Sequence, residues 1–216
     1  LPSIHKVGPG DWRPLSLSLP FPEVLAVRRE IIQSAVLRFA PDVVLVDHMP
    51  HGAMGELVPT LEALEGRATR IVLGLRDILD EPAVVRRRWR LEGAFDAVER
   101  YFHDVLIYGS RDVFDVSAEY DLPEEVSRRL RYCGYVCPSP ASPSDADKLR
   151  NRYLRDASAG DLIVAMAGGG ADADGLFTTL LSAAPAISAR RPCVVVIVTG
   201  PFLPRSEHRK LVRLAR

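Results

Sequence analysis

Five short apolar runs, separated by segments with helical spacing, constrain the fold of this 216-residue chain more than any other feature. Each run consists mainly of Val, Ile and Leu and is apolar at successive positions, not only at alternate ones. Continuous runs of this length predict parallel strands that are buried on both faces. The five runs are 43–47, 70–74, 104–108, 162–166 and 194–198.

The segments between these runs carry apolar residues on one stripe of a helix. Helices are predicted over 23–39, 81–102, 174–187 and 206–215. Strands that alternate with helices of this length predict an α/β fold with a doubly wound parallel sheet and right-handed crossovers.

The segment 137–144 interrupts this alternation. It reads Cys-Pro-Ser-Pro-Ala-Ser-Pro-Ser, and a stretch so rich in proline and serine has the composition of a linker. We therefore expect one Rossmann-like domain over 1–136 and the start of another over 145–216. The chain opens at Leu1 and closes at Arg216 within a helical pattern, so we also expect a segment of a longer protein in which both domains are incomplete.

Charge and composition exclude several classes of protein. The 28 basic residues balance the 28 acidic ones, which argues against a general nucleic-acid binder and against a polybasic membrane binder. No apolar run approaches the roughly 18 residues that a membrane span needs. Three cysteines are too few for a disulfide scaffold. We expect a cytoplasmic protein without a transmembrane segment.

A glycine-rich turn follows the fourth apolar run and opens a predicted helix. Gly168, Gly169 and Gly170 allow the backbone to approach a ligand closely, and the free N–H groups of the helix favour a phosphate. The spacing fits the dinucleotide pattern G-x-G-x-x-G/A, but the next strand ends in Thr199-Gly200 and not in the acidic residue which that pattern expects. The absence of Gly-Lys-Ser/Thr excludes a P-loop.

Two considerations weaken the hypothesis that this turn binds a phosphate. A tight connection between strand and helix needs glycine even without a ligand. Asp172 would repel a phosphate, and its expected role is that of helix N-cap.

Asp47, His48 and His51 lie at the carboxyl end of the first run, where open α/β sheets bind ligands. Two imidazoles and a carboxylate within five residues can supply a general base and the group that orients it. Metal binding is a weaker alternative, because the spacing matches no zinc pattern. A capping loop with solvated side chains is another. Arg76 or Asp77 also follows a strand end and can face the same cleft, with an internal ion pair as the alternative.

Six blocks follow one another along nearly the whole chain. They are DVVLVD at 42–47 with Pro50, Gly52, Glu56 and Leu57; LGLRDILD at 73–80 with Trp89; VLIYG at 105–109; YCGYV at 132–136; AGGGAD at 167–172; and VTGP at 198–201. In this order they resemble the bacterial predicted glycosyltransferases of the GT-B fold, which are distant relatives of the peptidoglycan N-acetylglucosaminyl transferase family.

The resemblance implies two Rossmann-like domains that face a cleft, an acceptor domain over 1–136 and a donor domain over 145–216, with 137–144 as the hinge. It implies transfer of a hexosyl or N-acetylhexosaminyl group from a nucleotide-sugar donor to the hydroxyl of a small-molecule or lipid-linked acceptor. The presumed mechanism inverts the anomeric centre and uses no metal and no cofactor, because helix N-termini and backbone N–H groups stabilise the leaving diphosphate.

The resemblance also assigns roles to residues of this chain. His51, His48 or Asp47 is the candidate base, and the donor is expected at Gly168–Gly170, Ala171, Thr199 and Gly200. The family's first glycine-rich loop and its acidic donor motif are expected before and after this segment, so the segment alone is expected to be inactive. A nucleotide-sugar epimerase and a non-catalytic nucleotide-sugar sensor are the alternatives. A dehydrogenase is disfavoured by the missing acidic residue.

Overall fold

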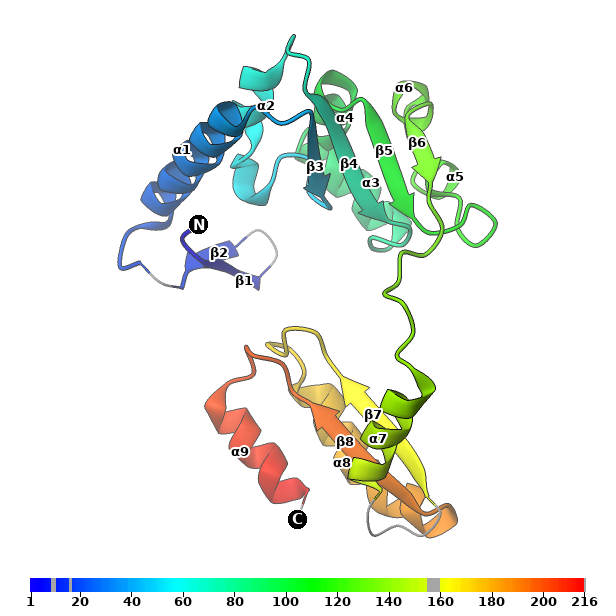
Figure 1. Ribbon diagram of the computed structural model, residues 1–216. Coiled ribbons are helices and arrows are strands. Elements are labelled where there is room, and N and C mark those ends of the chain that lie inside the picture. Colours follow the sequence, from blue (N-terminus) through cyan, green and yellow to red (C-terminus); the bar gives the residue numbers. More distant parts are fainter. Residues whose placement is uncertain (9–10, 16, 155–159, 216) are drawn as a thin grey trace. The chain divides into compact units, whose positions relative to one another are not determined.

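The computed structural model describes residues 1–8, 11–15, 17–154 and 160–215. The chain divides into two compact units, Leu1–Cys137 and Pro138–Arg216 (Figure 1). The boundary between the units falls at the start of the predicted linker. Val44, Val72 and Leu106 share one sheet of the first unit, whereas Ile163 belongs to a separate sheet of the second unit.

A four-stranded parallel sheet forms the centre of the first unit, in the order β3-β4-β5-β6. Its carboxyl ends lie at one edge, because the strands are parallel and in register. An antiparallel hairpin precedes the sheet and was not expected from the sequence. The strands are β1 (Ile4–Gly8), β2 (Asp11–Pro14), β3 (Val43–Asp47), β4 (Arg70–Arg76), β5 (Asp104–Tyr108) and β6 (Leu130–Tyr132).

Six helices and one 3-10 turn accompany this sheet in the described part of the first unit. Figure 1 shows α3 and α4 behind the sheet and α1 next to α2. The elements are α1 (Phe21–Phe39), η1 (Ala53–Gly55), α2 (Val58–Leu64), α3 (Pro82–Leu91), α4 (Ala94–Tyr101), α5 (Val116–Glu119) and α6 (Glu124–Ser127).

The single helix predicted over 81–102 is wrong. The chain forms α3 and α4 with a break at Gly93, whose φ of 65° lies in the left-handed region that favours glycine. The apolar spacing continues across the break, and Trp89 of α3 and Phe95 of α4 pack with their rings tilted by 58° and their centroids 5.4 Å apart. For this reason the periodicity alone did not reveal it.

The two faces of the sheet differ in burial. On one face Leu73, Val105 and Ile107 are completely buried and form the core with residues of α4 and α5. On the opposite face, at the edge strand β3, Val43 is 56% exposed and Leu45 is 57% exposed. The prediction that every run is buried on both faces is therefore correct for the core of β4 but wrong for β3.

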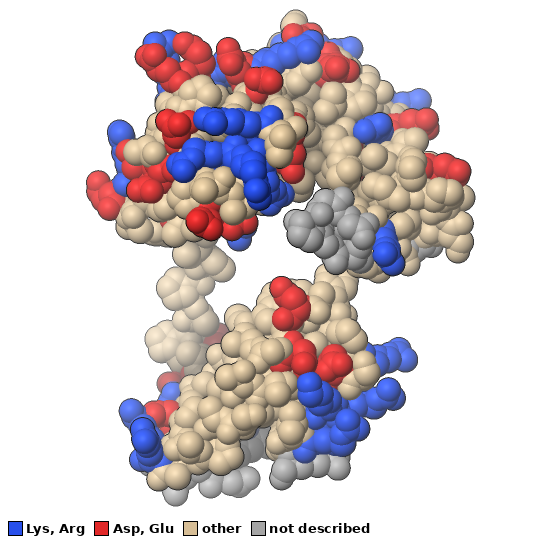
Figure 2. Space-filling model, turned by 180° about the vertical axis from the view of Figure 1, so that it is seen from behind, with Lys and Arg blue, Asp and Glu red and all other residues tan. Residues whose placement is uncertain are grey.

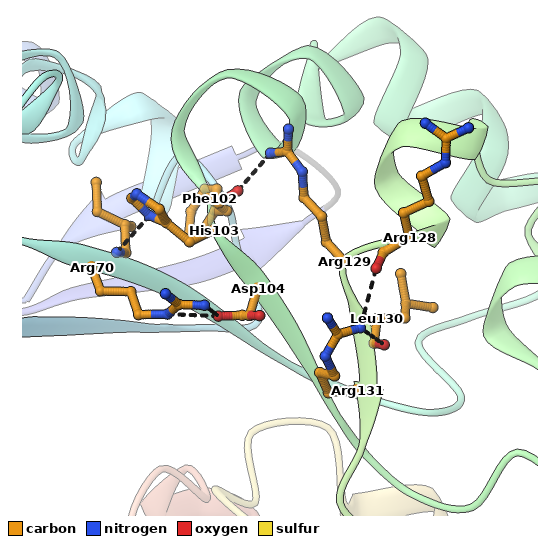
Figure 3. Close-up of polar contacts among 9 residues, drawn as sticks. Arg70, Phe102, His103, Asp104, Arg128, Arg129, Leu130 and Arg131 are labelled. Carbon is orange, nitrogen blue, oxygen red and sulfur yellow. Dashed lines mark hydrogen bonds and ion pairs between the residues drawn. The ribbon is translucent and has the colours of Figure 1, made fainter.

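Polar contacts fasten the amino ends of β4, β5 and β6 (Figure 3). Arg70 donates through Nε and Nη2 to the carboxylate of Asp104, at 2.8 and 2.5 Å. The backbone N–H of Ile71 donates to Nδ1 of His103 at 3.0 Å. Arg129 donates through Nη1 to the carbonyls of Val98 and Phe102, at 2.7 and 2.5 Å, and so caps the last turn of α4.

The second unit is smaller and contains one pair of parallel strands in its described part. Its core consists of Ala173, Phe177 and Leu211. Met166 is 65% exposed, so these strands also bury mainly one face. The elements are α7 (Pro143–Tyr153), β7 (Asp161–Met166), α8 (Asp174–Arg190), β8 (Cys193–Val198) and α9 (Arg205–Leu214).

The predicted linker at 137–144 is too long at its carboxyl end, because α7 begins at Pro143. Ser142 is the N-cap, and its hydroxyl accepts a hydrogen bond from the N–H of Asp145 at 3.2 Å. A serine cap followed by proline in the first turn is a helix start signal that the overall composition had concealed.

Candidate functional site

The candidate base residues lie where the sequence places them, in the loop after β3. Asp47 ends the strand, and His48 follows with a φ of 66° while its N–H donates to the carbonyl of Gly74 at 2.8 Å. Gly52 has a φ of 68°, and a Cβ there would lie 2.7 Å from Cγ of Leu57. The loop is therefore a tight turn, in which a side chain at residue 52 would clash with Leu57.

A buried ion pair anchors this loop to α1. The Glu56 side chain is 9% exposed and that of Arg28 is 11% exposed. Nε of Arg28 donates to Oε2 of Glu56 at 2.5 Å, and Nη2 donates to Oε1 at 3.0 Å. Nη1 of the same arginine donates to the carbonyl of Pro2 at 2.6 Å. This two-point pairing fixes the position of the loop that carries His51.

His51 is half-buried and faces the break between α3 and α4. Its Cε1 lies 4.0 Å from the position of a Cβ on Gly93. Burial lowers the pKa of His51, while the carboxylates of Glu92 and Asp96 act in the opposite direction. The net lowering favours the neutral imidazole at neutral pH, which is the form that accepts a proton.

Asp47 acts on a different neighbour. Burial is the main cause that raises the pKa of Tyr108, and the negative charge of Asp47 is the next. Among the described residues no hydrogen bond joins Asp47 to His51. The structure therefore places Asp47 at the end of β3 and His51 in the loop that follows, but does not combine them into a base with its orienting carboxylate.

Further side chains gather at the carboxyl ends of β4 and β5. Oδ2 of Asp77 accepts a hydrogen bond from the hydroxyl of Tyr135 at 3.0 Å, and Oδ1 accepts one from the N–H of Ile78 at 2.8 Å. The hydrogen bond from the Tyr135 hydroxyl to Asp77 raises the pKa of Tyr135. A Cβ on Gly109 would lie 2.6 Å from Oδ2 of Asp77. Asp77 thus accepts hydrogen bonds in place of the internal ion pair that the sequence left open.

In the second unit the glycine turn packs against the turn that follows β8. A Cβ on Gly170 would overlap the carbonyl of Thr199, and a Cβ on Gly200 would lie 2.5 Å from the carbonyl oxygen of Gly168. The N–H of Phe202 donates to the carbonyl of Gly169 at 2.8 Å. These contacts join the two segments backbone to backbone, so the glycines have a packing role whatever else they bind.

Gly168 differs from the other two glycines of its turn. It has a φ of 38°, and no heavy atom lies within 4 Å of a Cβ added there. Ala171, which follows the turn, is also exposed. Backbone at this strand end is therefore accessible to a ligand.

The prediction that Asp172 caps the next helix is wrong. Ala173 occupies the N-cap position of α8, no side chain caps the helix there, and Asp172 is exposed. Asp174 in the first turn instead accepts hydrogen bonds from Nζ of Lys210 at 2.9 and 3.1 Å. This interaction with Lys210 is the largest cause that lowers the pKa of Asp174, and it ties the start of α8 to α9.

A pocket of about 330 Å³ lies between the end of β8 and the first turns of α9. Two of its residues, Thr199 and Gly200, belong to the predicted donor set. The sequence reasoning missed the others, because charged residues at helical spacing have the pattern of an ordinary solvated face. The pocket is lined by Thr199, Gly200, Leu203, Arg205, His208 and Arg209.

Neither a metal cluster nor a membrane span is seen in the part of the chain that the structure describes. No three His, Cys, Asp or Glu side chains there are grouped so that they could hold a metal ion. None of the described helices is both long and apolar enough to cross a bilayer.

Comparison with known proteins gives no family for the chain. No family model matches it, and no curated protein does.

Proposed function

We propose that the chain acts in glycosyl transfer from a nucleotide-sugar donor to an acceptor hydroxyl, with the two-domain organisation of the GT-B fold. The observation that carries the proposal is the pair of interlocked turns at the carboxyl ends of β7 and β8, with a pocket beside Thr199 and Gly200. Ligands of open α/β sheets bind at this edge. The six sequence blocks and their order support sugar transfer as the reaction.

In this proposal the second unit binds the donor. Gly168, Gly169, Gly170 and Ala171 offer backbone N–H groups beside the start of α8, and Thr199 and Gly200 form the neighbouring wall. Backbone N–H groups and a helix N-terminus can stabilise the negative charge of a leaving diphosphate without a metal ion.

In this proposal His51 of the first unit is the general base. Its half-buried imidazole favours the neutral form, and Glu92 and Asp96 lie close enough to stabilise the imidazolium that forms. The acceptor hydroxyl loses its proton to the imidazole as its oxygen bonds to the anomeric carbon. The bond from that carbon to the diphosphate breaks, and the electron pair leaves with the diphosphate. His48 and Asp47 are the other candidates for the base.

A binding experiment tests the donor assignment. We expect the 216-residue chain to bind at least one member of a panel of nucleotide sugars in isothermal titration calorimetry, and to bind the free sugar much more weakly. Gly170→Val should weaken this binding, because its side chain would displace the turn at Thr199. Gly66→Val is the matched control, since Gly66 lies in the first unit, has a φ of 75° where Gly170 has one of 86°, and has no heavy atom within 4 Å of an added Cβ.

The outcomes separate the proposed function from its alternatives. Donor binding without any release of nucleoside diphosphate by the natural gene product would favour a non-catalytic sensor. If the chain binds no nucleotide sugar, both glycosyl transfer and the non-catalytic sensor are contradicted.

A further inference from the structure

The pocket beside Thr199 has one wall made of basic side chains. Arg205, His208 and Arg209 are spaced three and four residues apart on α9, so they share one face of the helix. Figure 2 shows the basic side chains of the second unit in two groups, a larger one on the right and a smaller one on the left. Thr199 and Gly200, which follow β8, also line the pocket.

Within the part of the chain that the structure describes, no acidic side chain pairs with the two arginines of this wall. The acidic residue of α9, Glu207, lies 3.6 Å from Nζ of Lys210, which also pairs with Asp174 at 2.9 Å. By contrast, neither Arg205 nor Arg209 forms an ion pair with any residue that the structure describes. Two guanidinium groups therefore line a concave site with no counter-charge among the described residues, while Asp174 and Glu207 pair with Lys210.

We propose that this pocket binds a diphosphate group, with Arg205, Arg209 and His208 as its binding residues. Guanidinium groups match phosphate oxygens in geometry as well as in charge, and Thr199 adds a hydroxyl donor. A volume of about 330 Å³ is at the lower end of the range for ligand pockets, so it suits a diphosphate better than a whole nucleotide sugar. The identification of the donor as the source of this diphosphate rests on the proposed function.

The test uses inorganic pyrophosphate as the probe and the 216-residue chain as the protein. Dissociation constants are measured by isothermal titration calorimetry at constant ionic strength. Arg205→Gln and Arg209→Gln should each weaken binding about tenfold or more, because each removes a charge-assisted contact with phosphate. The matched control is Arg213→Gln, which lies on the same helix, is exposed and does not line the pocket. It should change binding less than twofold.

Folding of each variant is checked by thermal melting followed by circular dichroism. If a glutamine variant melts early, Arg209→Lys keeps the charge but loses the planar fork, and it should bind pyrophosphate with an intermediate affinity. Absence of pyrophosphate binding to the unmodified chain overturns the inference. Equal weakening by Arg213→Gln also overturns it, as does tighter binding of a single-stranded RNA than of pyrophosphate at the same salt concentration.

Failure of this inference can be distinguished from failure of the proposed function. Arginine-dependent binding of pyrophosphate by a chain that binds no nucleotide sugar would support the diphosphate pocket and contradict glycosyl transfer. Nucleotide-sugar binding that is unchanged in both arginine variants would support the donor site and overturn the pocket. Nucleoside diphosphates added in a parallel titration should lose affinity in the arginine variants as pyrophosphate does, if the donor is the source.

Discussion

The hydroxyl group of Tyr108 on β5 lies over Gly74 on the neighbouring strand β4, in the space that a side chain at residue 74 would occupy. A Cβ there would overlap the hydroxyl and would lie 2.7 Å from Cζ of the ring. Asp47 on β3 is the register partner of Gly74 and helps to raise the pKa of Tyr108. Three adjacent strands thus meet at the edge that carries the candidate base loop.

This relationship predicts that Gly74→Ala destabilises the first unit. The added methyl group would force the Tyr108 ring from its place, and overpacking of this kind costs about 1–3 kcal/mol. The free energy of unfolding, measured by urea denaturation, checks this expectation. Tyr108→Ala removes the ring, so Gly74→Ala should cost much less in that background. Costs that simply add in the double variant would contradict the contact.

The lowered pKa of His51 predicts a dependence of stability on pH. In the unfolded chain the imidazole binds a proton near pH 6.5, whereas in the folded protein it does so only at a lower pH. The stability is therefore fully present above about pH 6.5 and is lost as the pH falls through the folded-state pKa. Urea denaturation between pH 5 and pH 8 measures this loss.

His51→Gln is the control for the pH experiment, since glutamine keeps a polar side chain that does not titrate. The variant should show a smaller loss of stability on acidification than the unmodified chain. Identical pH profiles for the two proteins would show that the His51 pKa is not lowered by folding.

The contacts of Arg129 predict a third stability effect, at the amino ends of the strands. Arg129→Met keeps much of the length of the side chain but removes the guanidinium donor from the carbonyl of Phe102 and leaves that of Val98 with the N–H of Phe102 alone. We expect a loss of about 1–3 kcal/mol in the free energy of unfolding. Arg131→Met is the comparison, because Arg131 is exposed and, among the described residues, bonds only to the nearby carbonyls of Arg128 and Leu130 (Figure 3). An equal loss in the two variants would argue against the capping role.

The sequence predicts the strands well where burial is nearly complete. In β4, Ile71, Leu73 and Leu75 are almost fully buried. The sequence predicts this burial because no polar residue interrupts the apolar run. The three-residue strand β6 was missed because Arg131 interrupts its apolar residues. The exposure of Leu45 was missed because a run of apolar residues does not show which face is left open.

The site was predictable only in part, for a related reason. Loop motifs after strands locate His51 and Gly168, because the strand ends are visible in the sequence. The contacts of Tyr135 with Asp77 and of Gly170 with Thr199 join segments that are distant in the chain. No local pattern encodes such contacts. In the sequence, Arg205, His208 and Arg209 have the pattern of a solvated helix face. Their role as lining of a pocket follows only from the structure.

The release of nucleoside diphosphate from nucleotide sugars by the natural gene product that contains this sequence tests the central claim most directly. His51→Ala should lower this turnover roughly 100-fold while donor affinity stays nearly unchanged, because a base acts in the transition state and not in donor binding. His48→Ala, in the same loop, should retain most of the activity. Normal turnover in both histidine variants would contradict the assignment of the base. The absence of turnover with every nucleotide sugar in the unmodified protein would contradict the proposed function itself.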